Sequence, residues 1–85
     1  MEIKDLRNQI DSIDEQMVKL FVERMQIAGK VAEYKKENNL SIYDKDREIE
    51  ILNKVEKLAG CEFKPYVKNL FSTIMQSSKD YQSKK

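Results

Sequence analysis

Four polar residues occupy positions on predicted helices where apolar side chains are expected. Arg24 falls on a line of apolar residues spaced three and four apart over residues 3–34. Lys35 comes eleven residues later, which places it about 20° round the helix and roughly 16 Å along its axis. Ser78 interrupts a second apolar line, and Gln82 follows one turn on. Because an unpaired buried charge is unfavourable, these groups either pair with one another or surround a polar ligand.

Each position also has an interpretation that needs no ligand. Arg24 could pair with a buried carboxylate or set the register of a coiled coil. Lys35 could extend its ammonium group to solvent from a helix end. Ser78 is small enough for a core, and Gln82 near the C-terminus could simply be solvated. Each of these four positions is weak evidence for a ligand site when taken alone, and the four together are stronger evidence.

Composition excludes several kinds of chemistry. The chain has no histidine, so neither a Ser–His–Asp nor a Cys–His arrangement is possible. Cys61 is the single cysteine, which argues against a zinc site, and two glycines are too few for a phosphate-binding loop. We therefore expect no metal and no cofactor. An enzyme built from this sequence would act through Arg, Lys, Ser, Gln, Asp, Glu or Tyr.

Length and charge set the class of protein. Eighty-five residues predict one domain spanning residues 1–85, and a net charge of +1 with interleaved signs argues against nucleic acid or an anionic membrane as partner. No apolar run is long enough to cross a bilayer, and the opening MEIKDLR does not resemble a secretory signal. Together with the lone cysteine, this predicts a cytoplasmic protein.

The pattern predicts an all-α fold of three helices. The first is very long, from about residue 4 to about residue 38, and ends at two asparagines. The second starts at Asp44 or Asp46, either of which can cap it, and ends at Gly60. The third opens with Pro65 in its first turn.

The length of the first helix predicts a partner. Some 35 residues span roughly 50 Å, whereas a compact domain of this size is only about 30 Å across. The apolar line continues through the overhang, so another surface must cover it. We expect a second copy of the chain, giving an intertwined helical homodimer.

Three segments together resemble the all-helical, AroQ-class chorismate mutases over essentially the whole chain. They are LRNQIDSIDEQMVKLFVERMQIAGKVAEYK at residues 6–35, YDKDREIEIL at 43–52 and SSKDYQ at 77–82. The resemblance implies an isomerase that rearranges chorismate to prephenate in phenylalanine and tyrosine biosynthesis. Many relatives carry a proline before the YD-like segment, where this chain has Ser41-Ile42. We expect a more flexible loop there and no loss of chemistry.

The resemblance also assigns a substrate-binding set, matched residue by residue. The set is Arg7, Arg24, Lys35, Asp44, Arg47, Glu48, Ser78 and Gln82. It implies that Arg7 reaches across the dimer into the partner's pocket, that arginines bind the two substrate carboxylates with Ser78 assisting, and that Lys35 and Gln82 donate to the ether oxygen. Glu48, with the backbone near Asp44, would bind the ring hydroxyl.

The reaction suits such residues, because it needs no proton transfer and no covalent intermediate. It needs the flexible arm of the substrate held in place and donors set against the charge that develops on the ether oxygen.

Alternatives remain open for the outer residues and for the activity. Arg7, Arg47 and Glu48 could be surface charges, and Asp44 could be only a helix cap. An isochorismate pyruvate-lyase on the same scaffold would use nearly the same cations, although the acidic pair at Asp44 and Glu48 favours the mutase. A helical dimerisation module without catalysis would instead pair Arg24 with a carboxylate.

Overall fold

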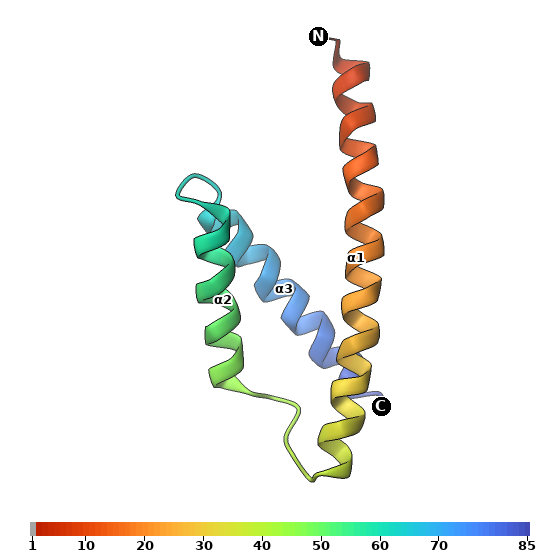
Figure 1. Ribbon diagram of the computed structural model, residues 1–85, viewed down its shortest axis with the longest axis vertical. Helices are drawn as coiled ribbons and strands as arrows, with labels where there is room; N and C mark the ends of the chain where they lie inside the picture. The colour runs from red at the N-terminus through yellow and green to blue at the C-terminus, as the bar shows by residue number, and fades with distance from the viewer. Residues whose placement is uncertain (1) are drawn as a thin grey trace.

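The computed structural model describes residues 2–85, which form three α-helices joined by short connections (Figure 1). The helices are α1 (Ile3–Glu37), α2 (Lys45–Ala59) and α3 (Lys64–Gln82), and the described residues contain no strand. The all-α prediction with a very long first helix is confirmed, and the predicted bounds agree within about one residue.

Local sequence signals define the helix ends. The Asp44 carboxylate accepts a hydrogen bond from the backbone N–H of Arg47 at 3.1 Å and so caps α2. Gly60 ends the same helix with a φ of +79°, a conformation that glycine adopts without strain. Pro65 lies in the first turn of α3, where its missing N–H costs nothing.

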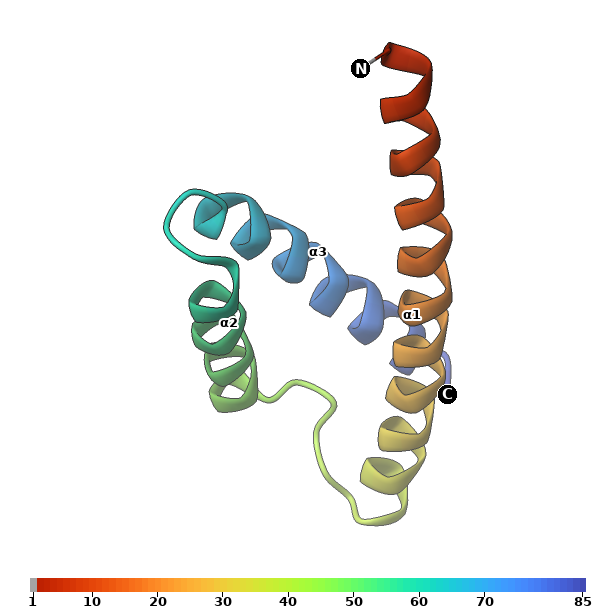
Figure 2. The same ribbon diagram turned by 45° about the horizontal axis from the view of Figure 1, so that its top comes forward.

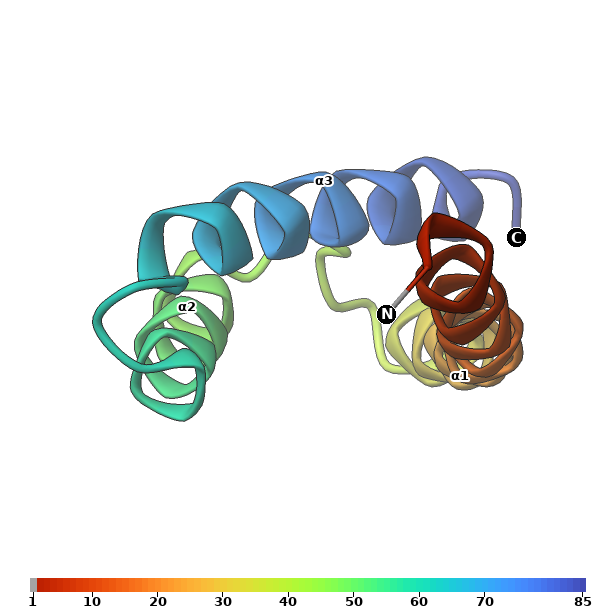
Figure 3. The same ribbon diagram turned by 90° about the horizontal axis from the view of Figure 1, so that it is seen from above.

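Helix α3 connects the other two helices. It packs against both α2 and α1, whereas α1 and α2 do not pack directly against each other. Viewed from above, α1 and α2 lie on the same side of α3, near its opposite ends, and are separated from each other (Figure 3). The position of α2 relative to α1 therefore depends on α3 and on the linker at residues 38–44.

The face of α1 that packs against α3 differs from the face expected. The buried residues of α1 are Ala28, Gly29 and Ala32, which lie one or two positions away from the predicted apolar line. A Cβ added at Gly29 would lie 3.1 Å from Cε2 of Tyr81, so the absence of a side chain at this position permits the close approach of α3. The predicted line itself stays exposed at Ile27. Small residues, and not the bulky ones, thus form the contact.

The N-terminal half of α1 extends beyond the rest of the chain (Figures 1 and 2). The structure measures 55 × 25 × 15 Å and its radius of gyration is 15.8 Å, against about 12 Å for a compact chain of this length. The apolar side chains along this segment are exposed, with Ile10 at 55% and Ile13 at 54%. An exposed apolar stripe of this kind is typical of a surface that binds a partner.

Candidate functional site

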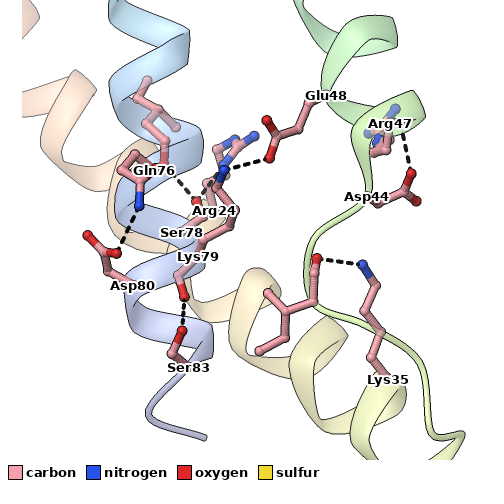
Figure 4. A network of polar contacts seen from close by, with 12 residues as sticks. Arg24, Lys35, Asp44, Arg47, Glu48, Gln76, Ser78, Lys79, Asp80 and Ser83 are labelled. Atoms are coloured by element: carbon pink, nitrogen blue, oxygen red, sulfur yellow. Dashed lines mark hydrogen bonds and ion pairs between the residues drawn. The ribbon is translucent and has the colours of Figure 1, made fainter.

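A pocket of about 260 Å³ opens between the C-terminal half of α1, the start of α2 and the end of α3. Seven of the eight residues assigned from the sequence line it: Arg24, Lys35, Asp44, Arg47, Glu48, Ser78 and Gln82. The remaining wall is mostly apolar, from Ile27, Ala28, Val31, Ile42, Ile51 and Met75, with Lys79 as a further cation. Residues from three helices thus converge on one site (Figure 4).

Arg24 is half-buried in this wall and donates from Nη1 to Oγ of Ser78 at 2.9 Å. The Ser78 hydroxyl in turn donates to the backbone oxygen of Ile74 at 2.9 Å, so its acceptor side faces Arg24. Burial lowers the pKa of Arg24, and the neighbouring charge of Arg47 lowers it further. No carboxylate of residues 2–85 forms an ion pair with Arg24, so the alternative of a buried Arg24–carboxylate pair is not found within the described chain.

Lys35 and Gln82 are each held by one backbone carbonyl. The Lys35 ammonium donates to the oxygen of Ile42 at 3.1 Å, and the Gln82 amide donates to the oxygen of Ala28 at 3.0 Å. An ammonium carries three N–H groups and a side-chain amide carries two. Both residues therefore keep N–H groups for a ligand while their positions are set by the protein.

The acidic side of the pocket is built at the start of α2. Glu48 pairs with Lys79 of α3, with its Oε2 at 3.0 Å from the lysine Nζ. Asp44 acts as the helix cap described above. Arg47 lies at the rim, and its guanidinium forms an exposed ion pair with Glu50. The structure thus brings Arg47 to the pocket without directing its charge to a partner inside it.

Arg7 is the one assigned residue that the structure keeps away from the pocket. It is exposed on the N-terminal overhang of α1, seventeen residues and therefore roughly 25 Å from Arg24 along the helix. It cannot reach the pocket of its own chain, which is the geometry that donation to a partner's pocket requires.

Lys79 is the polar pocket residue that the sequence reasoning missed. It lies three residues before Gln82, so helical spacing alone placed it on the neighbouring part of the same face. As a lysine in a chain rich in lysines, it carried no other signal.

Within residues 2–85, no helix is both long enough and apolar enough to cross a membrane. Nor does any group of three or more histidine, cysteine, aspartate or glutamate side chains in the described part of the chain come together as a possible metal site.

The fold and the pocket define a class: a small all-helical protein with a cation-rich site between its helices. Residues 6–83 match the sequence profile of the family described as "Chorismate mutase type II". The chain belongs to this family, as the resemblance implied.

Three relatives differ in how much of their own length this chain matches. The chain is 42% identical over 57 residues to the "Bifunctional chorismate mutase/prephenate dehydratase" of Aquifex aeolicus, covering 67% of this chain and 16% of that protein. It is 37% identical over 81 residues to the protein of the same description from Buchnera aphidicola, covering 92% and 21%. It is 37% identical over 57 residues to the "Chorismate mutase" of Methanocaldococcus jannaschii, covering 67% and 58%. The matched part of this chain therefore spans between about a sixth and somewhat over half of these relatives.

Proposed function

We propose that the chain is a chorismate mutase, which rearranges chorismate to prephenate within one molecule for phenylalanine and tyrosine biosynthesis. The observation that carries the proposal is that Arg24, Lys35 and Gln82 converge on one pocket, each fixed by a single hydrogen bond and each with further N–H groups available. Donors fixed before the substrate arrives need no reorganisation in the transition state.

The proposed roles follow the charges of the substrate, which carries two carboxylates and an ether oxygen. Arg24, supported by Ser78, binds a carboxylate. Lys35 and Gln82 donate to the ether oxygen, where negative charge grows as the C–O bond breaks. Arg47 would leave its exposed pairing with Glu50 to meet the second carboxylate, because a surface ion pair costs little to break.

The acidic residues of the pocket bind the ring hydroxyl of the substrate. Glu48 accepts its hydrogen bond, and the backbone beside Asp44 completes this end of the pocket. The reaction needs orientation and electrostatic stabilisation only, so a wall without histidine is sufficient.

We further propose that the active form is an intertwined homodimer in which Arg7 enters the partner's pocket. The exposed apolar stripe on the overhang of α1 supports the dimer, and the distance of Arg7 from its own pocket supports the exchange. Sedimentation equilibrium at micromolar concentration should report twice the chain mass of 10.1 kDa. A mass of one chain would refute the dimer.

A cytoplasmic location also remains a prediction. The exposed free thiol of Cys61 fits a reducing compartment.

The activity is tested by incubating the purified chain separately with chorismate and with isochorismate. Formation of prephenate supports the mutase, whereas salicylate plus pyruvate identifies the lyase. Absence of both activities, in protein that circular dichroism shows to be helical, would favour a dimerisation module. Lys30→Ala is the matched control for variants of Arg24, since Lys30 is an exposed cation on the same helix outside the pocket.

A further inference from the structure

Lys79 of α3 lines the pocket and contacts one residue of α2 and one of the linker, yet the roles proposed above do not use it. Its Nζ lies 3.0 Å from Oε2 of Glu48 and 5.1 Å from the centroid of the Tyr43 ring. The side chains of Lys79 and Glu48 are each only 27% exposed, so this ion pair is better shielded than the Arg47–Glu50 pair at the rim. Shielding from solvent strengthens an ion pair and lengthens its residence in one geometry.

The start of α2 needs such an attachment. Because α2 does not pack against α1, the first turn of α2 is positioned in the pocket by α3 and by the linker. The polar contacts that hold this region to the other two helices are those of Lys79 to Glu48 and Tyr43, and that of Lys35 to the carbonyl of Ile42. Lys79 therefore attaches both the last part of the linker, through Tyr43, and the first turn of α2, through Glu48, to α3. Figure 4 shows the contact with Glu48.

The positive charge of Lys79 also offsets the negative charge of Glu48. Glu48 is proposed to accept a hydrogen bond from a substrate that carries two negative charges, and an uncompensated carboxylate would repel that substrate. Asp44, the other acid of the pocket, already accepts from the Arg47 backbone N–H. The ammonium of Lys79 supplies the compensation that Glu48 otherwise lacks.

We propose that Lys79 is a positioning residue for the substrate hydroxyl: it orients Glu48 and offsets its charge, so that the carboxylate accepts a hydrogen bond without repelling the substrate carboxylates. This inference rests on the proposed mutase function. It predicts that Lys79 acts mainly on substrate binding and only through Glu48.

The first test compares Lys79→Met with Lys79→Arg. Methionine keeps the length of the side chain and removes the charge, so KM for chorismate should rise roughly three- to tenfold while kcat changes less than twofold. Arginine keeps a donor for Glu48 and should retain at least half of the wild-type kcat/KM. Lys68→Met is the matched control, since Lys68 is an exposed lysine on the same helix outside the pocket, and it should match wild type.

The second test places Lys79→Met in a Glu48→Gln background. If Lys79 acts through Glu48, the second substitution should change KM by less than twofold there. If Lys79→Met instead raises KM in the Glu48→Gln background as much as it does in the wild type, Lys79 attracts the substrate directly. That result would overturn the proposal. So would an arginine variant as impaired as the methionine variant.

The outcomes separate this inference from the function on which it rests. A wild-type chain that forms no prephenate refutes the mutase. An active wild type with an unchanged Lys79→Met variant refutes only the role of Lys79. Thermal unfolding by circular dichroism checks that Lys79→Met stays folded, and if it does not, the arginine variant and Glu48→Gln alone still test the charge compensation through KM.

Discussion

Arg24 and Ser78, 54 residues apart in the sequence, meet through a 2.9 Å hydrogen bond that fixes the guanidinium at the wall of the pocket. The bond links α1 to α3 beside the contact that Ala28 and Gly29 of α1 make with α3. A hydroxyl cannot neutralise the arginine, so the cation keeps its charge for a ligand.

Replacing Arg24 with alanine is expected to lower kcat/KM by about three orders of magnitude, because the pocket loses a preorganised cation. The continuous assay for loss of chorismate measures the effect. Lys30→Ala removes a cation from the same helix outside the pocket and should stay within twofold of wild type. Equal losses in both variants would point to a general charge effect and contradict the assignment.

Replacing Arg24 with leucine is expected to stabilise the folded chain. The lowered pKa of Arg24 means that folding disfavours its charged form, and this cost is present at every pH below the folded pKa. It disappears only in strongly alkaline solution, as the pH rises through the unfolded pKa. At neutral pH the leucine variant should therefore be slightly more stable than wild type; the gain is small because water still reaches part of the Arg24 side chain and screens its charge.

Urea unfolding at one fixed protein concentration measures this gain, since dimer stability depends on concentration. A lower midpoint for Arg24→Leu would show that the guanidinium contributes net stability and would weaken the case for a binding role.

Arg7→Ala and Arg24→Ala should complement each other when mixed. Each variant alone is expected to be inactive. In a heterodimer, one pocket carries both lesions and the other carries neither, so activity should recover to about a quarter of wild type after random exchange of subunits. Mass spectrometry of the mixture confirms exchange, and exchange without recovered activity would refute the donation of Arg7 across the dimer.

The Gln82→Glu variant is expected to have a low kcat/KM at neutral pH, and its kcat/KM should recover in part as the pH falls. An ionised carboxylate cannot donate a hydrogen bond and repels the charge developing on the ether oxygen. The protonated acid has one O–H, whereas the amide of Gln82 has two N–H groups, one of which already serves the carbonyl of Ala28. Recovery should therefore remain below wild type.

The pH profile of kcat/KM between about pH 4 and pH 8 measures this effect, with the wild type as control because its amide does not titrate. A flat profile for a folded Gln82→Glu variant would remove Gln82 from the reaction centre.

Gly29→Leu should disrupt the contact between α1 and α3. Even a Cβ at this position would lie 3.1 Å from the Tyr81 ring, so a leucine side chain must displace that ring from its contact with α1. We expect a loss of about 1–3 kcal/mol in the free energy of unfolding, together with loss of activity, since the same part of α3 carries Ser78 and Gln82. Unchanged stability would contradict the close packing at Gly29.

The sequence by itself determined the three helices and most of the candidate site. Asp44, Gly60 and Pro65 mark helix ends because capping depends on the residue and its nearest neighbours in the chain. Arg24, Lys35, Ser78 and Gln82 were recognisable because helical periodicity gives every position a direction. The other four site residues, and the role of each residue, came from the resemblance of three short segments to one family.

The tertiary structure decided what these residues meet. Helix α3 packs on Ala28, Gly29 and Ala32, one or two positions from the predicted line. This contact depends on the steric fit between Gly29 and Tyr81, which helical periodicity cannot predict. The pairing of Lys79 with Glu48 likewise joins helices that are connected through a turn and cross at an angle set by packing. Periodicity is a property of one helix, whereas a pocket depends on the relative positions of three, and these positions arise only when side chains distant in the sequence pack together.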